Sequence, residues 1–203
     1  MHPAPPFFFH VTNFSPPAVY FMSDDDPDAT FVARCIHGDL EAFGPLVERY
    51  QRQIFRAILH MVGNYEDTRE LTQQVFLKAF EHLSSFDQER KFFSWLYRIA
   101  MNESINHLKS RRSFEPIDEI DLPRDTRFDA VEKTRSVRQA VMALKPEYRS
   151  VVVLRHFMDC SYSDAAAVLN LPEKTVKSRL FAARQLLRDA LAPVGEKRTA
   201  ARW

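Results

Sequence analysis

The sequence predicts an all-α protein: two small helical domains joined by a flexible acidic linker, the second containing a helix-turn-helix. Apolar residues recur at steps of three and four along most of the chain. Good helix formers such as Leu, Ala, Arg and Glu fill these stretches. Only 4 of the 203 residues are glycine, which argues against a turn-rich β-sandwich or a glycine-loop nucleotide fold.

The first segment, residues 1–24, is predicted to be a disordered extension. Five prolines interrupt it and no basic region precedes its aromatics, so it makes a poor signal peptide. A second interpretation is that Met22 is the true start. No apolar run approaches the roughly 20 residues of a membrane span, so membrane insertion is not expected.

The first domain is expected to span residues 25–112. Its first helix begins near Asp28, in an acidic stretch that suits a helix N-terminus, and stops at Gly38. Asp39 is a plausible cap for a second helix that ends near Gly63. Asn64 then caps a third helix. A loop over 84–88 leads to a fourth helix, which starts near Phe92 and ends in a basic tail.

The linker is expected over residues 113–128, because this stretch is mostly acidic, contains two prolines and lacks a helical period. The second domain, residues 129–192, should contain a helix over 131–144, a break at Lys145-Pro146 and a helix over 147–157. Residues 193–203 form a tail. Basic residues predominate from Arg135 onward, whereas residues 23–48 are acidic, and a basic domain in a chain of net charge +1 suggests a polyanionic partner.

A helix-turn-helix is predicted from Ser161, which can cap a short helix, and Asn170, which tolerates the left-handed conformation that the turn requires. Leu171 is placed to fill the space between the helices, and Pro172 sets the backbone for the next one. The polar face of that next helix could contact phosphates and base edges in a major groove. Its candidate DNA-binding residues are Lys174, Thr175, Lys177, Ser178, Arg179, Phe181, Arg184 and Gln185.

Two motifs in the first domain resemble the conserved domain of bacterial sigma factors of the extracytoplasmic-function (ECF) group. They are D-x-x-x-L-x-Q-x-x-F-L-x-A-F, starting at Asp67, and F-x-x-W-L-x-R-I-A-x-N, starting at Phe92. The stretch from Val137 through the helix-turn-helix is similar to the family's second domain. The resemblance covers residues 28–192. It implies an initiation subunit that binds core RNA polymerase and promoter DNA, with an anti-sigma factor as a further partner.

The resemblance also assigns roles in the first domain. The third helix would grip polymerase through Asp67, Glu70, Leu71, Gln73, Gln74 and Phe76. The loop and fourth helix would open the −10 promoter element, catching an unstacked base and holding single-stranded phosphates. The residues assigned to this task are Ser84, Ser85, Phe86, Gln88, Arg98, Asn102, Asn106, Arg111 and Arg112. At helical spacing Trp95 is expected in the core. Gln74 and Ala182 depart from the family's usual Glu and Arg.

The main alternative is a stand-alone helix-turn-helix transcriptional regulator, which would bind duplex DNA without polymerase. An enzyme is not expected, since the 7 histidines lack metal-site spacing and no P-loop occurs. No metal or cofactor is expected either, because Cys35 and Cys160 are far apart and outside any CxxC pair. A chain with two unpaired cysteines fits a reducing cytoplasm.

Overall fold

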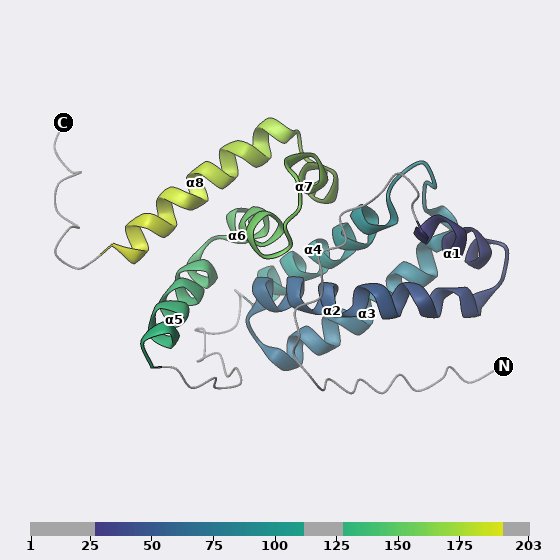
Figure 1. Cartoon of the computed structure of the whole chain (residues 1–203), viewed down its shortest axis with the longest axis horizontal. Helices are drawn as coiled ribbons and strands as arrows, with labels where there is room; N and C mark the ends of the chain where they lie inside the picture. Colours follow the sequence, from purple (N-terminus) through teal and green to yellow (C-terminus); the bar gives the residue numbers. More distant parts are fainter. Residues whose placement is uncertain (1–26, 112–127, 193–203) are drawn as a thin grey trace.

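The computed structural model describes residues 27–111 and 128–192, and within these ranges the chain is helical with no strand. This confirms the all-α prediction. The expected extension 1–24 with Met22, the tail 193–203 and all of the expected linker but Phe128 lie outside the described residues. The elements, shown in Figure 1, are α1 (Pro27–Ile36), η1 (Leu40–Ala42), α2 (Phe43–Val62), α3 (Tyr65–His82), η2 (Leu83–Ser85), α4 (Phe92–Arg111), α5 (Phe128–Ala143), α6 (Pro146–Val152), η3 (Val153–Phe157), α7 (Tyr162–Leu169) and α8 (Glu173–Leu191).

The helices α2, α3 and α4 pack on one another and enclose the core of the first half. Their inward faces carry fully buried side chains such as Leu46, Ile54 and Leu96. Helix α1 is fastened to α2 by the carboxylate of Asp28, which is 1% exposed and accepts hydrogen bonds from Arg49 and Tyr50. A buried carboxylate needs such partners, so this cluster fixes the otherwise short α1.

The predicted boundaries of the first three helices are close to the observed ones. Gly38 and Gly63 have φ of 99° and 82° and end α1 and α2. Asn64 caps α3 by accepting a hydrogen bond from the Asp67 amide at 2.9 Å. Asp39 differs from the prediction: its side chain makes no capping bond and instead pairs with Arg34 at 2.6 Å.

The second half consists of α5 to α8, with α6 and α5 both packed against α8. Pro146 occupies the first position of α6, as the expected break at Lys145-Pro146 requires, and the chain continues through the wide π-turns of η3. The Arg149 guanidinium is 5% exposed and donates to the backbone carbonyls of Met142 and Leu144, where α5 ends. These bonds hold the start of α6 against the end of α5.

The two halves do not stand apart. Helix α4 packs along α7, and α2 lies against η3, so the buried side chains of both halves form one continuous cluster. Figure 1 shows α7 next to α4, and α8 runs from α7 toward the left of the view, away from α4. This contact was not foreseen from the sequence, which suggested two modules separated by a tether.

Candidate nucleic-acid interface

The turn between α7 and α8 has the predicted helix-turn-helix geometry. Ser161 and Asp164 form a capping box at the start of α7, each side chain accepting from the other's backbone amide. Asn170 is left-handed, with φ 52° and ψ 49°. The amides of Asn170 and Leu171 donate back to the carbonyls of Ala167 and Ala166, which closes the helix in a Schellman motif. Pro172 lies just before α8.

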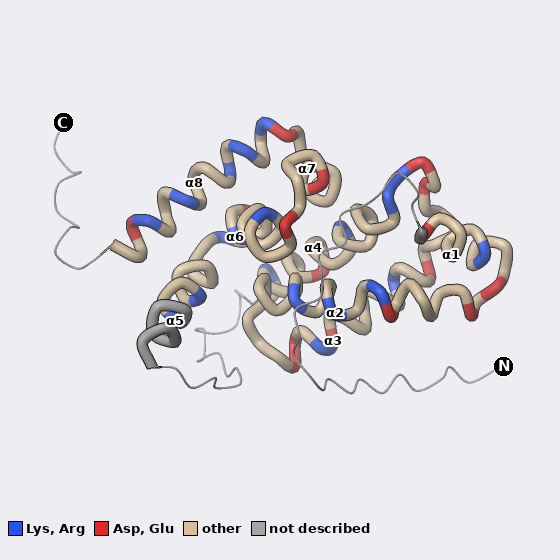
Figure 2. The backbone as a smooth tube through the Cα atoms, in the orientation of Figure 1, with Lys and Arg blue, Asp and Glu red and all other residues tan. Residues whose placement is uncertain are grey.

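Helix α8 buries one face and exposes the other. Val176, Leu180 and Ala183 are buried against the rest of the domain. Figure 2 shows Lys and Arg spaced along the helix. Of the eight predicted DNA-binding residues, the structure exposes Lys174, Lys177, Ser178, Phe181 and Arg184 and half-buries Thr175, Arg179 and Gln185. Phe181 is 66% exposed, which is unusual for a large aromatic side chain and leaves it available for contact.

The exposed cationic side chains on and beside this face contact neighbouring acidic, aromatic or imidazole groups. Lys177 pairs with Glu173 at 2.5 Å and lies 5.2 Å from the centre of the Tyr162 ring. Arg155 lies over the same ring at 4.5 Å. Arg184 approaches His156 at 3.3 Å. Partial burial, followed by the charges of Arg184 and Arg155, lowers the pKa of His156, so a neutral imidazole adds no charge to this surface.

The loop that joins α3 to α4 presents polar side chains around a buried ring. Ser84, Ser85 and Gln88 are exposed, as their predicted contact with an unstacked base requires. Phe86 differs from this expectation: it is 8% exposed and packs 5.1 Å from Trp95 and 5.8 Å from Phe92. Its ring therefore supports the loop from below. Trp95 is half-buried and belongs to the same aromatic cluster, in line with its expected core position.

Three of the assigned strand-binding residues of α4, Arg98, Asn102 and Asn106, follow one another at steps of four along one side of the helix. Asn102 and Asn106 are exposed. Arg98 is half-buried, and its Nη2 donates to the Ala167 carbonyl of α7 at 2.6 Å. Arg111 is the last residue of α4, and Arg112 lies outside the described residues. Among the members whose side chains the structure describes, Arg98 is thus the one that bonds to the helix-turn-helix.

A cavity of about 740 Å³ lies between the start of α4 and the helix-turn-helix. The first half contributes two cations, Arg90 and Lys91, together with Trp95 and Arg98. The second half contributes residues from both ends of α7, Asp164 among them, and the turn after it. The cations and the aromatic ring on the wall that the first half provides are a composition suited to single-stranded nucleic acid.

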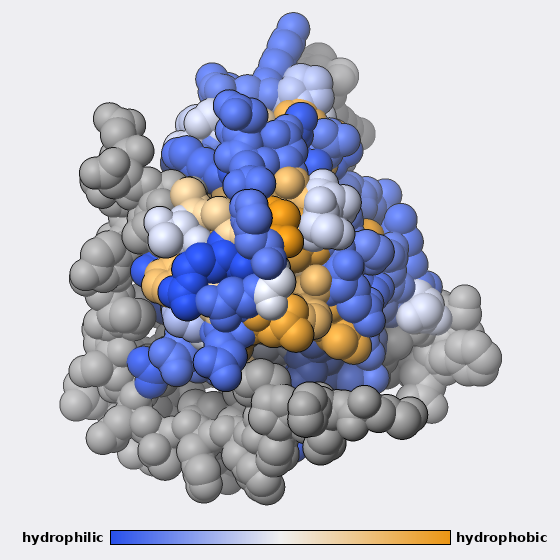
Figure 3. Space-filling model, turned by 90° about the vertical axis from the view of Figure 1, so that its right-hand side faces the viewer, coloured by the Kyte–Doolittle hydropathy of each residue, from blue (hydrophilic) through white to orange (hydrophobic). Residues whose placement is uncertain are grey.

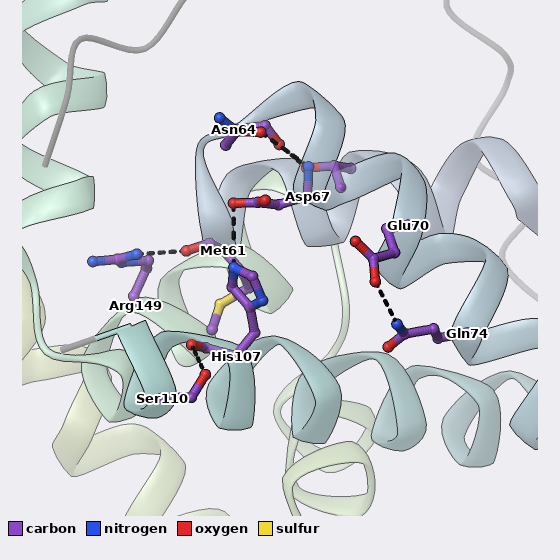
Figure 4. Close-up of polar contacts among 9 residues, drawn as sticks. Met61, Asn64, Asp67, Glu70, Gln74, His107, Ser110 and Arg149 are labelled. Carbon is purple, nitrogen blue, oxygen red and sulfur yellow. Dashed lines mark hydrogen bonds and ion pairs between the residues drawn. The ribbon is translucent and has the colours of Figure 1, made fainter. Parts of the chain in front are cut away.

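The exposed face of α3 differs in part from the predicted polymerase contact. Glu70 and Gln73 are exposed and Gln74 is half-buried, with Gln74 donating to Glu70 at 2.9 Å (Figure 4). Leu71 and Phe76, by contrast, are 5% and 7% exposed and belong to the core. A residue of α3 cannot serve both surfaces, because positions 71, 75 and 76 project inward while 70, 73 and 74 project outward.

Two apolar residues complete this face and were missed in the sequence. Leu77 is 57% exposed and Phe80 is 39% exposed. They follow Gln73 and Gln74 at steps of three and four, and this spacing on a polar face was the available signal. The end of α3 continues into η2, which packs against α1. Figure 3 views the molecule from that end and shows an apolar area framed by hydrophilic residues.

The start of α3 is tied to α4 as well. Asp67 lies 3.2 Å from His107, a contact drawn in Figure 4, and farther along Lys78 of α3 pairs with Glu103 at 2.7 Å. Asp67 is half-buried and positions α3 on α4.

Neither cysteine is part of a site. Cys35 and Cys160 are buried free thiols, and burial raises the pKa of both, that of Cys160 to about 12. No group of His, Cys, Asp and Glu in the described ranges 27–111 and 128–192 could hold a metal ion. Across those same ranges no helix has the length and apolar character needed to cross a bilayer.

Comparison with known proteins gives two family matches, one in each half of the chain. The family model of Sigma-70 region 2 matches residues 46–114, and that of Sigma-70 region 4 matches residues 134–187. The RNA polymerase sigma-H factor of Pseudomonas aeruginosa is 32% identical over 191 residues, which cover 85% of this chain and 98% of that protein. The ECF RNA polymerase sigma factor SigW of Bacillus subtilis is 30% identical over 171 residues, 76% of this chain and 91% of that protein.

Among solved structures, CnrH in complex with the cytosolic domain of CnrY superposes with a TM-score of 0.62 at 29% identity, covering 79% of this chain and 94% of CnrH. RpoE of Bartonella quintana, solved with the anti-sigma factor NepR, superposes with a TM-score of 0.61 at 20% identity and covers 73% and 96% of the two chains. The second likeness is one of fold.

Proposed function

The chain belongs to the ECF group of the sigma-70 family, and from this premise we propose which of its surfaces bind polymerase, the −10 element and the −35 element. As a sigma factor it directs RNA polymerase to promoters and is not itself an enzyme. The observation that carries the assignment is the pairing of a region 2 match over α2 to α4 with a region 4 match that contains the left-handed turn at Asn170.

The exposed face of α8 is proposed to enter the major groove of the −35 element. Lys174, Lys177 and Arg184 supply the cations that phosphates and guanine edges attract. Phe181 offers an apolar surface suited to a thymine methyl group. The ion pair of Lys177 with Glu173 is exposed, so exchanging it for a phosphate contact costs little free energy.

The loop and α4 are proposed to open the −10 element. Ser84, Ser85 and Gln88 can bind the edges of an unstacked base above the buried Phe86 ring. Arg98, Asn102 and Asn106 mark a path for the phosphates of the separated strand. Arg111 and Arg112 would extend this path. Because phosphate contacts release counterions, binding should weaken steeply as salt rises.

The outward face of α3 is proposed to bind core polymerase. Glu70, Gln73 and Gln74 provide polar groups, and Leu77 and Phe80 provide an apolar centre beside them. Exposed apolar residues rimmed by polar ones are typical of a protein-protein contact. Leu71 and Phe76 stabilise this face from the core.

An anti-sigma factor is the further partner proposed for this chain. CnrH, which is 29% identical, was solved in complex with the cytosolic domain of CnrY, and the fold neighbour RpoE was solved with an anti-sigma factor. A factor of this family acts on polymerase and chromosomal DNA, so we place the chain in the cytoplasm.

Promoter-directed transcription with purified core polymerase tests this function. The wild-type chain should make core polymerase initiate at specific promoters. The variant K177A/F181A should weaken −35 recognition while polymerase binding survives, and Q73A/L77A should do the reverse. Lys145 is exposed and outside both faces, so K145A is the control. Tight promoter binding by the chain alone, with no effect on core polymerase, would favour the stand-alone regulator and overturn the proposal.

A further inference from the structure

The contact between the two halves joins the strand-opening helix to the helix-turn-helix. Arg98 of α4 donates to the carbonyl of Ala167 at 2.6 Å, in the last turn of α7. A cation at the C-terminal end of a helix also meets the negative end of its dipole. One turn of the chain later, Asn170 begins the left-handed turn. The first half therefore contacts the second half at α7, the helix whose following turn sets the position of α8.

Three further contacts join the two halves. The Tyr97 hydroxyl, on a side chain that is 1% exposed, lies 3.7 Å from the sulfur of Met158. The imidazole of His60, near the end of α2, stacks on the Phe157 ring with centroids 3.9 Å apart. The Arg149 guanidinium donates to the Met61 carbonyl, as Figure 4 shows. Each pairs a residue of α2 or α4 with one of α6, η3 or the residue that follows η3.

This contact covers the part of the surface assigned to the −10 strand that lies at Arg98. While the Arg98 Nη2 donates to the Ala167 carbonyl, this group is not available for a bidentate contact with a phosphate. The cavity beside Trp95 has its opposite wall built from the helix-turn-helix, so α7 and the turn after it stand where an unwound strand would run past Arg90 and Lys91. The unwound DNA strand and the helix-turn-helix therefore cannot occupy this surface of α4 at the same time.

The dimensions of a promoter give the same result. The −35 and −10 elements are about 25 base pairs apart, which is about 85 Å of B-form DNA. Helix α4, with 20 residues, is only about 30 Å long, and α7 lies along it. The 16 residues 112–127 can reach at most about 55 Å. Reading both elements at once therefore requires that the halves separate.

We infer that the packing of α7 on α4 is an autoinhibitory contact, in which the free chain masks the Arg98 part of its own −10 surface with its helix-turn-helix domain. The inference rests on the proposed role of α4. Core polymerase and the unwound strand bind the separated halves, so they draw the chain out of the closed arrangement by mass action.

The experiment measures the distance between the halves and the affinity for a single strand in the full-length chain without polymerase. Spin labels at cysteines introduced for the exposed residues His82 and Asp189 report the distance, since the two native thiols are buried. Two variants are designed to open the chain. H60A/F157A removes the stack between the halves, and H60R places a positive charge near Arg138, which repels it. None of these residues belongs to a proposed DNA or polymerase surface. F55A, which removes a ring from the Phe55–Tyr65 pair within the first half, is the control.

The wild-type and F55A chains should be mostly at the short distance, and in the opened variants the ratio of long to short distances should rise by up to about tenfold. Loss of an aromatic contact at the interface should raise affinity for a −10 single strand up to about tenfold. Circular dichroism checks that each variant is folded, and H60R decides the outcome if H60A/F157A is not. A wild-type chain that is already open overturns the inference, as does an opened variant whose strand affinity is unchanged. Polymerase-dependent transcription by the wild type tests the proposed function separately.

Discussion

Acidification should open the chain, because His60 can take up a proton readily only after the halves separate. Burial in the contact, followed by the charges of Arg138 and Arg56, lowers the pKa of His60 from its ordinary 6.5 to about 4. Arg138 belongs to α5 and Phe157 to η3, so both influences come largely from the second half. Once that half leaves, we expect the pKa of His60 to return toward its ordinary value.

The sign and size follow from linkage. The closed form disfavours the protonated imidazole, so its stability relative to the open form is greatest above pH 6.5 and falls as pH drops toward 4. Going from about pH 7.5 to about pH 5.5 should shift the closed-to-open ratio about tenfold toward the open form, or about 1.4 kcal/mol. Arg56 and Arg138 keep their charge over this range and do not titrate.

The distance between labels at positions 82 and 189, recorded across this pH range, measures the shift. H60F is the control, since a phenyl ring keeps the stack on Phe157 and carries no proton. Its distance distribution should stay the same at both ends of the range. The reasoning fails if the wild-type distribution does not change with pH, or if H60F changes as much as the wild type.

Three further substitutions test the local chemistry of the fold by urea unfolding. N170A should lower the free energy of unfolding by about 1–2 kcal/mol because of the left-handed backbone, whereas N170G should be within about 1 kcal/mol of the wild type; equal losses in both would contradict this. S161A should cost about 1–2 kcal/mol by removing the cap of α7, and S161T should recover most of it. D28A should cost about 1–3 kcal/mol, since the buried Tyr50 hydroxyl loses this acceptor, and the Y50F background should reduce that cost; an unchanged cost would show that the bond contributes little.

Local chemistry explains what could be predicted from the sequence. Asn64, Ser161 and Asn170 act on backbone groups within three residues of themselves, so their roles depend on nothing farther away. The division of α8 into a buried and an exposed face was predictable for the same reason, since Val176 and Leu180 are about one helix turn apart on one face and Lys177 and Phe181 are one turn apart on another.

Tertiary contacts explain what was missed. The family motif that starts at Asp67 mixes core and surface positions, so Leu71 and Phe76 entered the predicted polymerase face although their side chains point inward, while Leu77 was left out. Phe86 follows two exposed serines in a loop, and only the positions of Phe92 and Trp95 show that its ring is buried. Aspartate is a common N-cap residue, but the Asp39 carboxylate pairs with Arg34 instead of with the backbone of the next helix.

The contact between the halves could not be found by such reasoning, and its composition bears on how it works. Arg98 and Arg149 both cross it to reach backbone carbonyls, which every sequence possesses, so no complementary side-chain pattern marks the partner surface. Hydrogen bonds of this kind contribute about 1.5–3 kcal/mol when the donor is charged, and a solvated arginine regains much of that from water or a phosphate. An interface that combines two such bonds with a single aromatic stack is stable enough to keep the free chain closed. It is also weak enough for polymerase and an unwound strand to separate the halves, after which Arg98 can exchange the Ala167 carbonyl for a phosphate.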